Sequence, residues 1–178
     1  MPAAAAASGA SETTVDGLVV VDKPAGWTSH DVVAKLRSVF GQRRIGHAGT
    51  LDPDATGVLL VGLGRVTRLM RYLQDGTKRY RGDVVFGVAT DTLDASGRVV
   101  RETAMTVTRA DVERAVVGSV GEVEQVPPMV SAVKVGGRRL HELARKGETV
   151  DREPRTVTVH RFDIAPTSEP LVVRAEVA

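Results

Sequence analysis

The chain of 178 residues contains no cysteine. This absence excludes disulfide bonds, thiolate metal sites and a cysteine nucleophile, and it is typical of a reducing compartment. Aromatic residues make up only 3% of the chain, so valine, leucine and alanine must fill the core. No apolar run reaches the length of a membrane span. We therefore expect a cytoplasmic protein that has no membrane partner.

The N-terminal segment lacks the basic residue that a secretory signal places before its apolar stretch. Residues 1–16 are rich in alanine and serine, and a segment of this composition cannot bury enough apolar surface to fold. We expect these residues to form a disordered tail and the ordered chain to begin at Gly17.

Positive charge is clustered, although the formal net charge is only +2. In the first cluster only Asp75 opposes the basic residues, and in the second only Glu142 does. The clusters comprise Arg65, Arg68, Arg71, Lys78, Arg79 and Arg81, and then Lys134, Arg138, Arg139, Arg145 and Lys146. The two clusters could follow the phosphates of a nucleic acid, although either cluster taken alone is better explained as a solvated helix face.

Strand and helix patterns alternate irregularly along the chain, which favours an α+β fold with a mixed, largely antiparallel sheet flanked by helices and loops. Residues 17–178 are expected to form one domain. Strands are predicted over 18–21, 58–61, 80–86, 130–135, 156–159, 162–164 and 171–177, with a bulge between the fifth and the sixth. Helices are predicted from Thr28 or Ser29 to Gly41 and over 66–73, 108–117 and 138–146.

The segment 46–57, Gly-His-Ala-Gly-Thr-Leu-Asp-Pro-Asp-Ala-Thr-Gly, is the most informative stretch of the sequence. We expect it to be a long loop, because it is rich in glycine and Pro53 pushes the preceding residue away from helical angles. The loop frames one carboxylate, that of Asp52. Loops on a rigid scaffold often carry function, so Asp52 is a candidate reactive group.

Other catalytic patterns are absent or incomplete. Gly62-Leu63-Gly64 follows a strand, but Thr67 stands where a dinucleotide site has its third glycine. The four histidines show no metal-ligand spacing, and His47 with Asp52 and Asp54 is weak evidence for a cation site. We therefore expect neither a metal nor a cofactor.

A carboxylate without metal or cofactor can act as a general base or as a covalent nucleophile at a glycosidic bond. Asp54 is poorly placed as the second carboxylate that a glycosidase requires. Tyr80 lies in a basic strand and offers a stacking face for an extruded base, although tyrosines at this spacing are commonly part of a core or a sheet surface. These residues together suggest chemistry at the glycosidic bond of a nucleic acid.

Six strings of the sequence closely resemble the bacterial tRNA pseudouridine-55 synthases of the TruB type. They are residues 21–29, 46–57, 78–81, 90–97, 127–134 and 140–147, and they occur in the order that this family has. The resemblance covers the chain from about Gly17 to its end and implies the pseudouridine synthase catalytic fold.

The resemblance also implies residue roles. Asp52 would be the nucleophile that assists cleavage of the uracil–ribose bond, Tyr80 would stack on the flipped base, and His47 would fill the gap left when the T-loop opens. Arg68 and the segment 138–146 would contact the RNA backbone. The implied partner is the T-arm of tRNA, bound by a monomeric enzyme that needs no cofactor.

Asp91 and Asp94 lie in a polar segment, residues 90–97, that the resemblance places near the cleft. We expect these two carboxylates to serve the structure of the loop or the positioning of RNA.

One family feature is not found in the 178 residues. The family supplies an arginine to its catalytic aspartate from a Gly-Thr-Tyr-Ile-Arg type segment, which would follow the strand at 171–177. We therefore expect a C-terminally incomplete catalytic domain that turns over slowly or not at all. A second hypothesis is an RNA-binding or RNA-folding module without turnover. A third, a small-molecule carboxylate enzyme, is disfavoured by the basic clusters.

Overall fold

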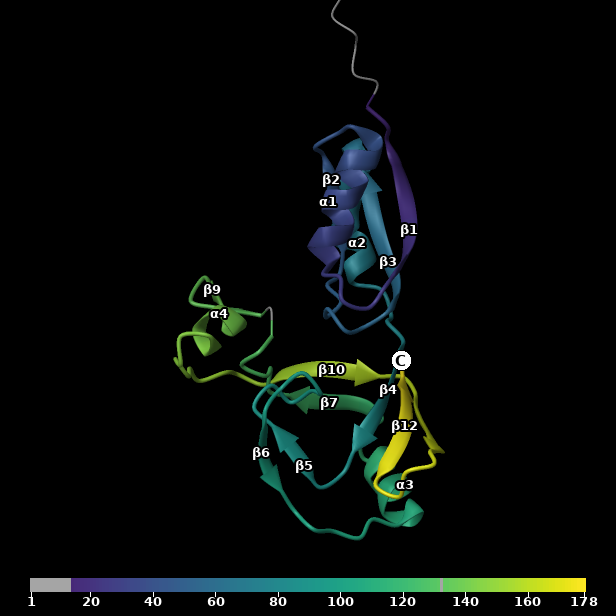
Figure 1. The fold of residues 1–178 in the computed structure, drawn as a ribbon, viewed down its shortest axis with the longest axis vertical. Coiled ribbons are helices and arrows are strands. Elements are labelled where there is room, and N and C mark those ends of the chain that lie inside the picture. Colours follow the sequence, from purple (N-terminus) through teal and green to yellow (C-terminus); the bar gives the residue numbers. More distant parts are fainter. Residues whose placement is uncertain (1–13, 132) are drawn as a thin grey trace, which may run out of the picture. The chain divides into compact units, whose positions relative to one another are not determined.

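The computed structural model describes residues 14–131 and 133–178 of the chain. The chain divides after Gly76 into two compact units, which are described separately (Figure 1). Residues 1–13 of the expected tail lie outside the described residues. Val15 exchanges hydrogen bonds with the side chain of Gln42, and Asp16 accepts bonds from Arg65, so ordered contacts begin before Gly17.

The first unit contains a three-stranded antiparallel sheet with the order β1-β3-β2. Its strands are β1 (Gly17–Lys23), β2 (Ile45–Ala48) and β3 (Gly57–Leu63). Its helices are α1 (Ser29–Phe40), the 3-10 helix η1 (Gly64–Leu69) and α2 (Met70–Gln74). The prediction of a loop over 46–57 is therefore wrong for its first three residues, which belong to β2. Pairing with β3 outweighs the weak strand propensity of these residues.

Helix α1 has well-defined ends. The Thr28 hydroxyl accepts from the Asp31 N–H at 3.1 Å, and the Asp31 carboxylate accepts from the Thr28 N–H at 2.8 Å, which completes a capping box. Gly41 ends the helix in the left-handed region with φ 61°. These local signals confirm the predicted boundaries.

The core of the first unit lies between α1 and one face of the sheet. It consists of Val32 and Val33 from α1, Ile45 from β2, and Leu59, Val61 and Leu63 from β3. Met70 of α2 packs on Gly62, whose Cβ position would lie 3.1 Å from the Met70 sulfur.

The helix predicted over 66–73 is wrong in type over its first half. Residues 64–69 form the 3-10 helix η1, in which the Thr67 hydroxyl donates to the Gly64 carbonyl at 2.8 Å. A threonine hydroxyl bonded three residues back favours this tighter turn over an α-helix.

The described residues of the second unit form four small antiparallel sheets, with the orders β11-β12-β4, β10-β7, β5-β6 and β8-β9. Its strands are β4 (Tyr80–Val85), β5 (Val88–Thr90), β6 (Val99–Glu102), β7 (Gly121–Gln125), β8 (Lys134–Val135), β9 (Arg138–Arg139), β10 (Arg155–Val159), β11 (Phe162–Pro166) and β12 (Val172–Val177). Its helices are α3 (Arg109–Val117) and α4 (Leu140–Ala144). All strand pairs in the described part of the chain are antiparallel, and helices and sheets together make an α+β fold.

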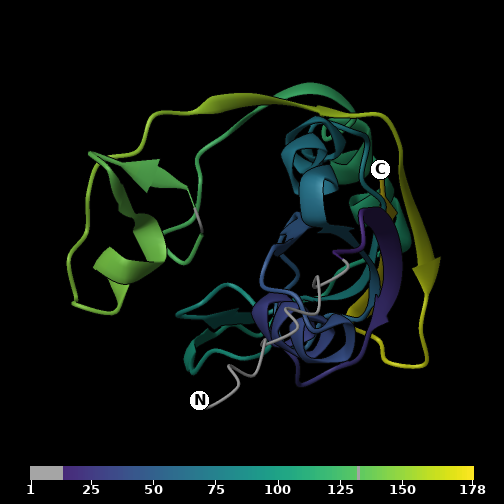
Figure 2. The same ribbon diagram turned by 90° about the horizontal axis from the view of Figure 1, so that it is seen from above.

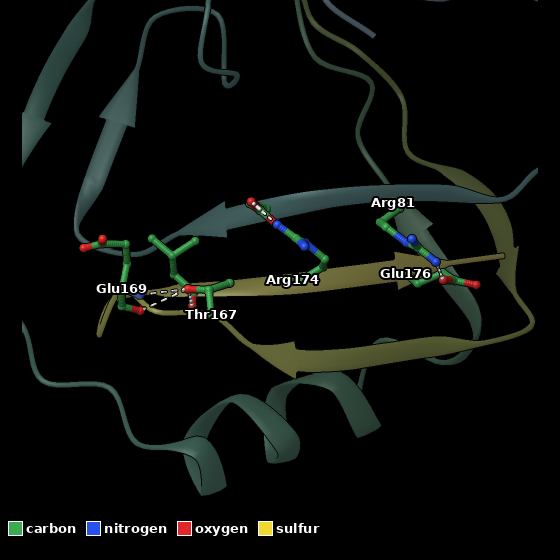
Figure 3. A network of polar contacts seen from close by, with 7 residues as sticks. Arg81, Thr167, Glu169, Arg174 and Glu176 are labelled. Atoms are coloured by element: carbon green, nitrogen blue, oxygen red, sulfur yellow. Dashed lines mark hydrogen bonds and ion pairs between the residues drawn. The ribbon is translucent and has the colours of Figure 1, made fainter. Parts of the chain in front are cut away.

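One face of β4 and β12 is charged. Arg174 on β12 binds both carboxylate oxygens of Asp83 at 2.8 and 3.0 Å, and Arg81 on β4 binds Glu176 at 2.9 Å (Figure 3). The Arg174 guanidinium lowers the pKa of Asp83. The opposite face, with Val84, packs towards α3 around an apolar groove of about 300 Å³. The strand predicted over 80–86 is thus confirmed as β4.

Two predicted elements of the second unit are confirmed only in part. Of the described residues in the strand predicted over 130–135, only those of β8 form a strand, and the basic segment 138–146 forms β9 followed by the short helix α4. The hairpin and α4 lie side by side in both views (Figures 1 and 2). Leu140 and Leu143 of α4 are buried, so the apolar residues of this segment, and not its basic ones, hold α4 in the fold.

The bulge predicted between residues 159 and 162 is also wrong. β10 pairs with β7, whereas β11 pairs with β12, so the chain passes from one sheet to another at His160 and Arg161. Their N–H groups both donate to the Ala178 carbonyl, at 2.8 and 3.2 Å. The change of phase in the sequence marks this transfer.

Candidate active site

Asp52 lies in the loop between β2 and β3, and its side chain is exposed. The backbone is held on both sides of it. The N–H of Leu51 donates to the Ser29 hydroxyl at 3.0 Å, and the Pro53 carbonyl accepts from the Gly26 N–H at 2.9 Å. The carboxylate is therefore presented to solvent from a fixed segment of backbone, which suits a reactive group.

The fully buried side chain of Lys23 also holds the backbone of the Asp52 loop. The Lys23 amine donates to the carbonyls of Pro24, Trp27 and Pro53 at 3.0, 2.6 and 3.1 Å. Three carbonyl acceptors match the three N–H donors of an ammonium group. Lys23 thus joins the end of β1, the turn before α1 and the Asp52 loop.

Ser29 and Lys23 were both missed as site residues from sequence. Their partners lie 22 and 30 residues away along the chain, so no local spacing indicates the contacts. The only available signal was that both residues belong to the string 21–29 shared with the TruB type.

His47 lies in β2, opposite Val61 of β3, and its side chain is half-buried. Its Nδ1 atom is in contact with the Gly49 carbonyl oxygen. The ring of His30, in the first turn of α1, meets the His47 ring edge-on, with 5.2 Å between centroids and 78° between planes. The first unit therefore contains both His47 and the Asp52 loop.

Tyr80 is the first residue of β4 and stands opposite Val177 of β12. Its side chain is 55% exposed, as a residue that stacks on a base must be before the base arrives. Tyr80 belongs to the second unit, whereas Asp52 and His47 belong to the first.

Within the first unit, no arginine or lysine among the described residues forms an ion pair with the Asp52 carboxylate. The described ranges 14–131 and 133–178 also hold no group of three or more histidine, aspartate or glutamate side chains that could bind a metal ion. In the same ranges, no helix has the length and apolar character needed to cross a membrane.

The expected RNA-contacting arginines have different surroundings. Arg68 lies in η1 and is exposed. Arg138 forms a two-fold contact with Glu148, both bonds measuring 3.1 Å, and this guanidinium lowers the pKa of Glu148. Arg145 and Lys146 are exposed in the turn after α4.

Asp94 organises the turn between β5 and β6. Its carboxylate accepts bonds from the hydroxyl and N–H of Ser96 and from the Thr92 hydroxyl, and these bonds lower the pKa of Asp94. Asp91 accepts from the Arg98 N–H at 2.9 Å. These contacts give both carboxylates a structural role in the loop.

Residues 37–178 match the family model described as TruB family pseudouridylate synthase, N-terminal domain. The chain belongs to the TruB family. The expected family resemblance is thus confirmed over most of the sequence.

Curated relatives named tRNA pseudouridine synthase B are about half identical to this TruB family chain. The protein from Symbiobacterium thermophilum is 53% identical over 161 residues, which cover 90% of this chain and 54% of that protein. A protein from Bacillus cereus is 50% identical over 150 residues, which cover 83% of this chain and 49% of that protein. The chain therefore spans about half the length of these relatives.

Solved structures show the same fold. A Cbf5-Nop10-Gar1 complex matches with a TM-score of 0.63 and 27% identity, covering 90% of this chain and 39% of that chain. An H/ACA RNP bound to a substrate RNA containing 2′-deoxyuridine matches with a TM-score of 0.59 and 23% identity, covering 90% and 37%. The TruB family chain thus has the α+β fold of pseudouridine synthases.

Proposed function

We propose that this chain carries the catalytic aspartate of a tRNA pseudouridine synthase that isomerises uridine 55 in the T-loop. The observation that carries the proposal is the exposed Asp52 carboxylate, whose loop backbone is fixed by Ser29, Gly26 and Lys23. The names of the relatives support the reaction and the tRNA substrate.

In the proposed reaction, the Asp52 carboxylate bonds as nucleophile to the target nucleotide while the bond between N1 of uracil and C1′ of ribose breaks. The bond between Asp52 and the nucleotide breaks again before the product leaves, which restores the free carboxylate. The base turns, C5 bonds to C1′, the hydrogen on C5 leaves as a proton, and N1 takes up a proton. No redox partner is needed, because the product is an isomer of the substrate. The exposed carboxylate can reach a nucleotide that has left its stack.

Tyr80 and His47 serve the flipped state of the RNA in this proposal. Extrusion of a base costs a few kcal/mol, and stacking on an aromatic side chain returns about 1–3 kcal/mol per base. Tyr80 offers an exposed ring for this contact. His47 would occupy the space that the flipped bases leave, and the protein would act on the T-arm as a cytoplasmic monomer built on the domain 17–178.

The test uses unmodified tRNA transcripts. The chain, and the chain extended by the C-terminal half of the Symbiobacterium thermophilum relative, are incubated with transcripts that carry uridine or cytidine at position 55, and pseudouridine is mapped. We expect the extended protein to form pseudouridine at position 55 of the uridine transcript and none in the cytidine transcript, and we expect the chain by itself to form it slowly or not at all. Tight binding of both transcripts without product from either protein would overturn the enzyme and favour a module that binds RNA without turnover.

A further inference from the structure

The ring of His47 is held from two sides. On one side the Gly49 carbonyl contacts Nδ1, and on the other the edge of the His30 ring lies 5.2 Å away, measured between centroids. Edge-to-face aromatic pairs in this range of distance are favourable. The backbone of His47 is fixed by the pairing of β2 with β3, and these two contacts act on the orientation of the ring.

The first turn of α1 provides the rigid base for His30. The capping box of Thr28 and Asp31 encloses this turn, with bonds of 3.1 and 2.8 Å. Ser29, one residue before His30, is buried and bonds to the N–H of Leu51 beside Asp52. One turn of helix therefore contacts both the His47 ring and the backbone next to Asp52.

His30 itself is exposed and has no part in the hydrophobic core. Its removal should therefore leave the fold intact while the His47 ring loses its edge-to-face contact with His30. A side chain that is already oriented loses less conformational entropy on binding, so a freed ring binds RNA more weakly.

We infer that His30 is a positioning residue that orients the His47 ring for entry into the opened T-loop. This inference rests on the proposed function of His47. On this inference, the first turn of α1 fixes the position of the His47 ring relative to Asp52 on the RNA-binding surface of the first unit.

The experiment measures binding of the chain to a T-arm RNA hairpin and to an unrelated hairpin. The variants are His30→Ala, His30→Phe, His47→Ala and His30→Ala with His47→Ala. His160→Ala removes an exposed histidine of the second unit and is the matched control. Nuclear magnetic resonance of the His47 ring in the RNA-free chain reports directly on the contact with His30.

We expect His30→Ala to weaken T-arm binding by about 3- to 10-fold, the range that an aromatic pair contributes. His30→Phe keeps a ring edge and should restore most of the affinity, and the control should bind as the unaltered chain does. The double variant should bind no more weakly than His47→Ala, because His30 acts through His47. The His47 ring signals should move in His30→Ala.

Three results would overturn the inference: unchanged T-arm binding by His30→Ala, equal losses in His30→Ala and His30→Phe, or additive losses in the double variant. If neither the unaltered chain nor the chain extended by the C-terminal half of the Symbiobacterium thermophilum relative prefers the T-arm hairpin, the proposed function fails instead. In that case unchanged His47 signals in His30→Ala would overturn the positioning contact as well.

Discussion

The Lys23 amine is fully buried and gives its N–H donors to three backbone carbonyls, one of them in the Asp52 loop. An amine buried in this way stabilises the fold only while every donor has an acceptor. Its removal also takes a donor from three carbonyls, of which that of Pro53 keeps the Gly26 N–H as a partner. A buried polar group left without a partner costs about 1–3 kcal/mol.

Lys23→Met should therefore lower the free energy of unfolding of the first unit by roughly 2–4 kcal/mol, part of the cost being offset by the apolar side chain. The measurement is denaturant unfolding followed by fluorescence of Trp27, the single tryptophan of the chain. Lys35→Met, an exposed lysine of α1, is the control. Equal unfolding midpoints for the two variants would contradict the role given to Lys23.

Gly64 and Gly41 form a matched pair that tests whether an added Cβ atom meets neighbouring atoms at Gly64. Both are left-handed, with φ 57° and 61°, so alanine meets the same backbone strain at each. At Gly64 the new Cβ would lie 2.1 Å from an Asp16 carboxylate oxygen and 2.8 Å from the Val15 carbonyl, whereas at Gly41 it meets nothing within 4 Å. We expect Gly64→Ala to destabilise the first unit by about 1 kcal/mol or more beyond Gly41→Ala. Equal losses would show that Val15 and Asp16 do not pack on η1.

At the scale of the element, helix α1 depends on its capping box. Hydrogen bonds from the hydroxyl and N–H of Thr28 lower the pKa of Asp31 below the ordinary value of 3.8. Because the pKa is lower in the folded state, the stabilisation is present above the unfolded pKa and is lost as the pH falls through the folded pKa. Asp31 is exposed, so the effect is modest.

Asp31→Asn should thus lower the free energy of unfolding of the first unit at neutral pH. On acidification, the variant should lose less of this free energy than the unaltered chain does. Thr28→Ala should lower the free energy of unfolding by about 0.5–2 kcal/mol. Trp27 fluorescence in denaturant, recorded from neutral to strongly acidic pH, measures both. Asp54→Asn changes an exposed carboxylate outside the cap and is the control. An identical pH dependence in Asp31→Asn and the unaltered chain would contradict the prediction.

The elements that the sequence predicted correctly are those with local signals. The two capping boxes, Thr28 with Asp31 and Thr108 with Asp111, act over three residues and are visible as patterns. β2 was missed because its strand character comes from its partner β3, and no local pattern carries that information. The position of Asp52 in a loop could be predicted, because Pro53 and the nearby glycines are local signals. The contacts of Lys23 and Ser29 with that loop could not be predicted, because they join residues far apart in the sequence.

At the scale of the whole molecule, affinity for RNA should depend on the basic residues after α4. Arg145 and Lys146 are exposed, whereas Arg114 on α3 is paired with Asp111. We expect Arg145→Gln with Lys146→Gln to weaken T-arm binding and to reduce the slope of log affinity against log salt by about 2, or about 1 for each phosphate contact. Arg114→Gln, the control, should leave the slope unchanged. Equal slopes in both variants would show that Arg145 and Lys146 do not belong to the RNA-binding surface.

The most direct test of the central claim is release of the C5 hydrogen from uridine 55. A tRNA carrying tritium at C5 of its uridines is incubated with the chain extended by the C-terminal half of the Symbiobacterium thermophilum relative, and tritium in water is counted. We expect release to fall by at least about 1,000-fold in Asp52→Asn, as loss of a nucleophile requires, and to stay within about 3-fold in Asp54→Asn. Release by Asp52→Asn at the rate of Asp54→Asn would contradict the account.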